Sequence, residues 1–102
     1  MADTAQFFDE FLKGKMADNK SIGKVFKFDI TGAGTWLVDF GAEEITKLDD
    51  GAEAKADCTI TCAQSDWEAL LDNPSNAMSL FMMGKLKADN LGLATQLQKI
   101  LG

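Results

Sequence analysis

The chain has 102 residues, of which 46% are apolar and 25% charged, a composition typical of one globular domain with a single core. It contains no His and no Arg, which excludes catalytic histidines, histidine metal sites and bidentate guanidinium clamps on phosphate or carboxylate. The formal net charge of −6 argues against a nucleic-acid partner, because proteins bind nucleic acid through a basic surface.

An amphipathic helix is the first predicted element, over residues 4–17, with Asp3 or Thr4 as its N-cap. Its apolar side chains recur at helical spacing, which predicts one stripe packed against the rest of the domain. The stripe consists of Phe7, Phe8, Phe11, Leu12 and Met16.

Strands follow, because the apolar residues then recur at every second position. Residues 24–31 and 35–41 alternate on either side of Gly32-Ala33-Gly34, which predicts a β-hairpin. Residues 43–48 predict a third strand and residues 55–62 a fourth. One face of these strands is apolar and the other polar, so we expect an antiparallel sheet that helices cover on one side.

The two cysteines, Cys58 and Cys62, lie on the same face of the fourth predicted strand. At about 3.3 Å per residue their Cα atoms would be roughly 13 Å apart, whereas an intramolecular disulfide needs less than about 7 Å. A metal pair is the alternative, but the chain offers no further cysteine and no histidine as a ligand. We therefore expect two buried, reduced cysteines in a reducing compartment.

Helices and a short strand complete the chain. Ser65 and Glu68 have the spacing of a capping box, and Asn73 before Pro74 predicts the start of another helix, which Gly84 ends. Residues 85–88 alternate and predict a fifth strand at an edge of the sheet. Asn90 is the expected cap of a last helix. These elements predict a two-layer α+β domain over residues 1–102.

Residues 56–101 contain ADCTIT, SDWEALL, a proline-containing helix and GKLKADNLGLATQLQKIL. Together these motifs resemble the sterol carrier protein type 2 family, and FKFDITGAGTWLVDFG is similar to the first hairpin of that family. The resemblance therefore extends over nearly the whole chain. It implies a mostly antiparallel five-stranded sheet with helices covering one face.

Lipid binding and transfer without catalysis is the function that this resemblance implies. Members of the family hold fatty acids, fatty acyl-CoA, sterols or phospholipids in a hydrophobic tunnel between sheet and helices, so we expect lipid ligands, transient membrane contact and no cofactor or metal. The family often has a polar residue, typically Gln, directly before Gly-Lys-Leu-Lys. Met83 stands there in this chain, which puts a polar contact at that end of the tunnel in doubt.

The predicted lipid-lining residues are inward-facing apolar positions of the strands and the later helices. They are Phe28, Ile30, Trp36, Val38, Ile60, Ala77, Met78, Phe81, Met82, Leu86, Leu93 and Leu97. Periodicity alone does not separate a tunnel from a packed core. The adaptable methionines near Phe81 and the small side chains along the fourth strand favour a cavity. The alternative is a non-catalytic interaction or regulatory module with a closed core.

Charge is unevenly distributed along the chain. Between Lys13 and Phe28 there are five lysines and one acid, Asp18. This segment is either a solvated helix end or a basic edge that meets acyl-CoA phosphates and anionic lipid surfaces. We expect a cytoplasmic protein, because the chain shows no signal peptide, no apolar run of roughly 18 residues and no C-terminal Ser-Lys-Leu-type tripeptide. The opening Met favours a free protein.

Overall fold

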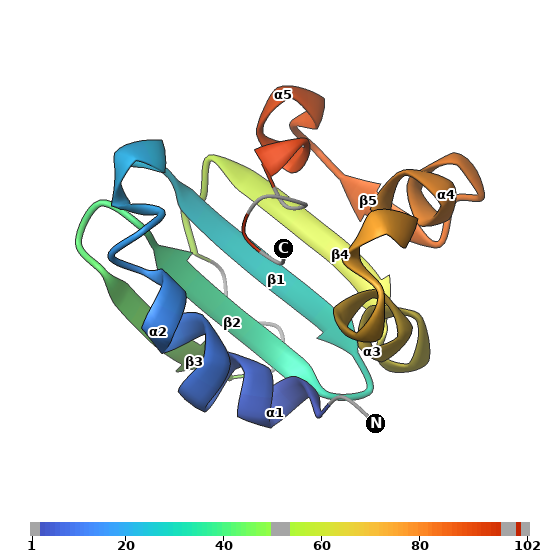
Figure 1. Cartoon of the computed structure of the whole chain (residues 1–102), viewed down its shortest axis with the longest axis horizontal. Coiled ribbons are helices and arrows are strands. Elements are labelled where there is room, and N and C mark those ends of the chain that lie inside the picture. Colours follow the sequence, from blue (N-terminus) through green and yellow to red (C-terminus); the bar gives the residue numbers. More distant parts are fainter. Residues whose placement is uncertain (1–2, 50–53, 97–99, 101–102) are drawn as a thin grey trace.

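The computed structural model describes residues 3–49, 54–96 and 100. Five strands form one sheet in the order β3-β2-β1-β4-β5, and helices pack on one of its faces (Figure 1). The predicted α+β class and two-layer arrangement are thereby confirmed. The strands are β1 (Val25–Thr31), β2 (Gly34–Asp39), β3 (Glu44–Leu48), β4 (Cys58–Ala63) and β5 (Leu86–Ala88).

The sheet is mixed, because the central strand β1 and its neighbour β4 run parallel. The pairs β1–β2, β2–β3 and β4–β5 are antiparallel, so the sheet is mostly antiparallel, as the family resemblance implies. The expected antiparallel arrangement of the first four strands is wrong for one pair, β1 and β4. After β3 the chain crosses to the other side of β1 instead of continuing the meander, and β4 then runs in the direction of β1.

The first helix consists of three consecutive segments, α1 (Thr4–Gln6), the π-helical η1 (Phe7–Phe11) and α2 (Leu12–Lys15). The Gln6 N–H donates to Asp3 Oδ1 over 2.9 Å, which confirms Asp3 as the cap.

The π-helical turn of η1 changes which side chains face the sheet. The Leu12 N–H bonds to the Phe7 carbonyl, five residues back. This wider turn rotates Phe11 outward, so its side chain is 52% exposed while Phe7, Phe8 and Leu12 are buried. The inward placement of Phe11 is therefore wrong.

Helix α3 (Gln64–Asp72) begins after Ala63 without a side-chain cap, so the expected capping box does not form. Glu68 has a tertiary role instead. Its Oε2 accepts hydrogen bonds from the Thr4 N–H over 3.1 Å and from the Thr4 hydroxyl over 3.0 Å. The carboxylate thus joins the start of the first helix to α3.

The remaining helical segments are short. They are η2 (Lys20–Ile22), η3 (Pro74–Asn76), α4 (Ala77–Met82) and α5 (Leu91–Ala94). Gly84, with φ of 74°, follows α4 and confirms the expected end of that helix. Asn90 caps α5, because its Oδ1 accepts the Leu93 N–H over 3.2 Å. Asn73 instead accepts the Ser75 hydroxyl over 2.6 Å. Helix α4 begins at Ala77, and the side chain of its N-cap residue, Asn76, makes no capping hydrogen bond.

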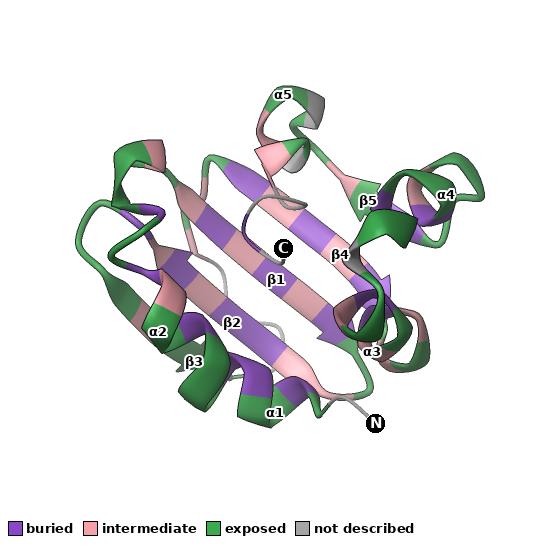
Figure 2. Cartoon of the chain, viewed as in Figure 1, coloured by how far each residue is buried: buried purple, intermediate pink, exposed green. Residues whose placement is uncertain are grey.

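The core lies between the sheet and the helices. Buried positions alternate with less buried ones along β1 and β4, and along β2 after the two adjacent buried residues Thr35 and Trp36 (Figure 2). Phe8 stacks between two indoles, with ring centroids 4.4 Å from Trp36 and 5.9 Å from Trp67. No helix in the described parts of the chain combines the length and apolarity needed to cross a membrane.

Candidate functional site: the apolar layer between sheet and helices

One row of apolar side chains crosses the sheet beneath the helices. Phe28 on β1 pairs in register with Trp36 on β2 and with Ile60 on β4, and Ile60 pairs with Ala88 on β5. Ile30 and Val38 lie on the same buried face, since the side chains of a strand alternate between faces. The strand residues predicted to contact lipid are thus brought together on one surface.

The helical residues of the predicted site divide into two groups. Ala77 is buried, as is Leu86 on the adjoining strand β5, while Phe81 and Leu93 are half-buried and pack against the core. Leu97 lies outside the described residues.

Met78 and Met82 do not lie on the inner face. They are 60% and 84% exposed, because α4 turns Ala77 and Leu80 toward the core and so directs these two methionines to solvent. Their inward placement is wrong, since one side of a six-residue helix cannot bury every apolar side chain that it carries.

The apolar layer also contains buried residues that are not among the predicted lipid-lining residues. They are Phe7, Phe8, Trp67, Leu70 and Ile100, all buried. The helical spacing that predicts the stripe of the first helix already marks Phe7 and Phe8. For Trp67 and Leu70 the signal is their separation of three residues on one helix, which places them on the same side of α3.

Two buried polar atoms in this apolar layer have no partner among the residues that the structure describes. They are the Nε1 atoms of Trp36 and Trp67, which make no hydrogen bond within this part of the chain. An unsatisfied buried donor costs about 1–3 kcal/mol. Such N–H groups are suited to donate to an oxygen of a carboxylate, ester or hydroxyl group that enters the layer.

The two cysteines are free and buried on β4, as expected. Burial, together with the charge of Asp66, raises the pKa of the Cys62 thiol to about 11. Burial also raises the pKa of Cys58, whose Sγ donates to the Asn90 carbonyl over 3.5 Å. Both thiols are therefore protonated and unreactive at neutral pH. Within the described residues, no group of acidic, cysteine or histidine side chains could hold a metal ion.

The raised pKa of Cys62 predicts a loss of stability at alkaline pH. In the unfolded chain the thiol ionises near pH 9, whereas in the folded chain it ionises near pH 11. The stabilisation is thus complete below the unfolded pKa and is lost as the pH rises through the folded one. Urea midpoints measured between about pH 8 and pH 11 should fall less steeply for Cys62→Ala than for the unchanged chain. Equal slopes in the two proteins would contradict the raised pKa of Cys62, because the substitution leaves every other titratable group in place.

A hollow of about 370 Å³ lies at the tip of the β1–β2 hairpin, lined by residues 29–35. It is open to solvent, and its polar lining includes the Thr35 hydroxyl, 3.5 Å from the Asp29 carboxylate. It is not the predicted tunnel, because it lies at the turn rather than beneath the helices.

Residues 6–102 match the SCP-2 sterol transfer family. The chain belongs to this family of lipid-binding domains. Sterol carrier protein 2 of Rattus norvegicus is 45% identical over 87 residues, and its Homo sapiens counterpart 42% over 87 residues. Each alignment covers 79% of this chain and 16% of the relative, so the chain spans only a small part of the length of these proteins.

Solved structures share the fold. Sterol carrier protein 2 like 3 from Aedes aegypti superposes with a TM-score of 0.75 at 16% identity, over 96% of both chains. Sterol carrier protein 2 like 2 from the same organism gives a TM-score of 0.73 at 20% identity, over 93% of this chain and 94% of the other. Sterol carrier protein 2 of Aedes aegypti, in complex with palmitate, gives 0.66 at 19% identity, over 100% of this chain and 97% of the other.

Proposed function

We propose that this chain binds one lipid molecule at a time between its sheet and helices and transfers it between membranes, without catalysing a reaction. The observation that carries the proposal is the continuous buried apolar layer in a chain of the SCP-2 sterol transfer family. A related structure with the same fold binds palmitate. Long-chain fatty acids and their CoA esters are accordingly the first ligand classes to test, followed by sterols and phospholipids.

The proposed lining consists of the buried and half-buried members of the predicted site. They are Phe28, Ile30, Trp36, Val38, Ile60, Ala77, Phe81, Leu86 and Leu93. The indole N–H groups of Trp36 and Trp67 support a ligand with an oxygen at one end of its chain, because they have no acceptor among the described residues. A cytoplasmic location stays a prediction from the sequence.

One observation favours the alternative, a non-catalytic interaction module with a closed core. The rings of Phe8 and Trp36 are stacked at 4.4 Å, which leaves no room between the first helix and the sheet at that point. A ligand would therefore pass beside this stacked pair, within reach of the Trp36 N–H, and extend beneath α4 and α5. Mass spectrometry of lipids extracted from the native protein separates the two functions, since only the carrier copurifies with stoichiometric lipid.

Palmitate and palmitoyl-CoA should displace a fluorescent fatty acid from the delipidated, folded protein with micromolar or lower Kd. Burial of each CH₂ group contributes about 0.8 kcal/mol. After the costs of ordering the ligand, a net binding free energy of about −8 kcal/mol is reachable, which corresponds to about 1 μM. Octanoate is the matched control, and its shorter chain should bind at least about a hundredfold more weakly. A flat titration with palmitate would contradict the proposal.

A further inference from the structure

An exposed apolar patch lies on the outer side of α4. Met78, Met82 and Met83 are 60%, 84% and 60% exposed, and Phe11 is the other large exposed hydrophobic side chain among the described residues. Met78 and Met82 are four residues apart and so share one face of the helix, and Met83 follows at its C-cap. We call these three residues the methionine face.

The methionine face is at one end of the molecule. Helix α4 packs against the edge strand β5, on the side of the domain away from α1 and α2 (Figure 1). Most of the α4 surface is exposed (Figure 2). The face is therefore accessible to a large planar partner without hindrance from the first helix.

The charge around this face differs from that of the chain as a whole. Residues 73–88 form the longest stretch without an acidic residue, although the net charge is −6. Lys85 and Lys87 lie in this stretch, both exposed, and neither forms an ion pair with another described residue. Asp72 and Asp89 bound the stretch on its two sides. The result is an apolar patch next to two cations.

We propose that the methionine face is a membrane-docking surface that inserts into anionic lipid bilayers, with Lys85 and Lys87 at the level of the headgroups. The proposal rests on the proposed function, because a lipid carrier must meet the membrane that supplies or receives its cargo. Methionine side chains are flexible and adapt to a fluid apolar surface. Lysine adds attraction to an anionic leaflet, an effect that salt screens.

A second copy of the chain suits this face less well. A symmetric dimer through the methionine face would bring the same patch of each copy together. Lys85 and Lys87 of one copy would then approach those of the other, and like charges repel. An anionic bilayer has the complementary charge.

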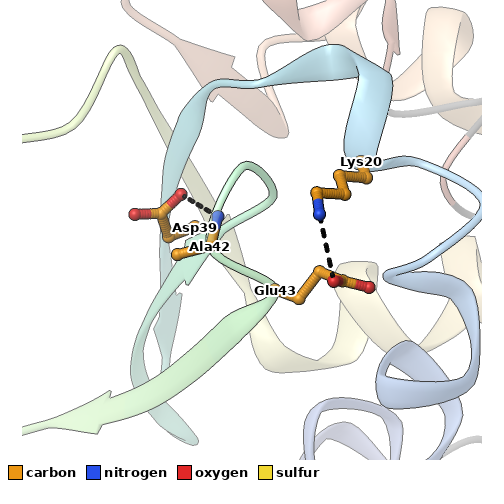
Figure 3. Close-up of polar contacts among 4 residues, drawn as sticks. All are labelled: Lys20, Asp39, Ala42 and Glu43. Atoms are coloured by element: carbon orange, nitrogen blue, oxygen red, sulfur yellow. Dashed lines mark hydrogen bonds and ion pairs between the residues drawn. The ribbon is translucent and has the colours of Figure 1, made fainter.

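The lysine-rich segment predicted from the sequence as a membrane edge is the competing surface. Lys20 Nζ lies 3.6 Å from Glu43 Oε2, so part of its charge is neutralised within the protein (Figure 3). Lys15 Nζ lies over one face of the Phe11 ring, 5.0 Å from its centroid, although the side chain is half exposed. The exposed Glu10 on the same helix adds a negative charge. This segment therefore has less apolar and cationic surface to offer a membrane than the methionine face.

Sedimentation with vesicles of phosphatidylcholine, with and without phosphatidylserine, tests the proposal on the full chain. The triple variant Met78→Gln, Met82→Gln and Met83→Gln should bind both vesicle types at least about tenfold more weakly. Phe11→Gln is the matched control, since it removes an exposed hydrophobic side chain elsewhere, and it should bind as the unchanged chain does. Lys85→Gln with Lys87→Gln should weaken only binding to phosphatidylserine vesicles, most at low salt.

Two readouts keep this test separate from that of the proposed function. Vesicle binding is measured on delipidated protein, and palmitate binding is measured without vesicles. All variants should keep the circular dichroism spectrum and the palmitate Kd of the unchanged chain, because the methionine face lies outside the proposed lining. A chain that binds vesicles but no palmitate would contradict the proposed function alone.

Four results would overturn the membrane-docking surface. The first is unchanged vesicle binding by the methionine variant, and the second is an equal loss in Phe11→Gln. The third is found by analytical ultracentrifugation, if the unchanged chain is a dimer and the methionine variant a monomer. The methionine face would then bind a second copy of the chain. A larger loss on Lys13→Gln with Lys15→Gln than on the Lys85 and Lys87 pair would likewise place the anionic contact on the first helix.

Discussion

Replacing Phe8 with Ala should lower the free energy of unfolding by about 3–5 kcal/mol, a large part of the roughly 5–15 kcal/mol that stabilises a typical domain. The Phe8 side chain is fully buried and joins three elements. Its ring stacks on Trp36 of β2 and on Trp67 of α3, with a centroid 5.3 Å from that of Phe28 on β1. Removal of the ring leaves a cavity that these rigid neighbours cannot fill.

Urea unfolding followed by tryptophan fluorescence measures this loss, because both indoles contact Phe8. Phe11→Ala is the matched control on the same helix. Its side chain is half exposed, so we expect a loss below about 1 kcal/mol. Similar losses for both variants would show that the first helix does not pack on the sheet through Phe8.

The sequence predicts the faces of the strands well because the signal is local. Phe26, Phe28 and Ile30 alternate with polar residues whatever lies beside them, and the structure buries all three. The direction of β4, in contrast, could not be predicted from the sequence. Alternation looks the same in a parallel and an antiparallel pair, so the pattern of residues 55–62 contains no information on the crossover that places β4 parallel to β1.

Individual contacts were harder to predict where tertiary structure decides between local alternatives. Ser65 and Glu68 have the spacing of a capping box, but the Glu68 carboxylate bonds to Thr4, which is remote in sequence. The π-helical turn that exposes Phe11 is equally absent from the spacing of the first helix. Both errors lie where the first helix meets the rest of the domain.

The candidate site shows the same limit. Phe28, Trp36 and Ile60 were predictable as one inner surface because the alternation identifies the apolar face of each strand, whatever the direction of its neighbour. Met78 and Met82 were not, because every apolar residue of α4 has the same chemistry. The direction in which the helix presents them depends on its packing against β5. An exposed methionine and a lining methionine are identical in the sequence.

Phe81→Trp should weaken palmitate binding by at least about tenfold and change stability little, if the space beneath α4 is open in the empty protein. Phe81 is half-buried and packs against the core from α4, so a larger ring would extend into the space proposed for the acyl chain. In a closed core the same ring would overpack, which typically costs about 1–3 kcal/mol. The lipid carrier and the closed interaction module thus predict opposite results in fluorescent fatty acid displacement and in urea unfolding.

Phe11→Trp is the matched control, since the same substitution at an exposed position should alter neither palmitate affinity nor stability. Lost stability with unchanged palmitate affinity would contradict the lipid carrier and favour the closed interaction module.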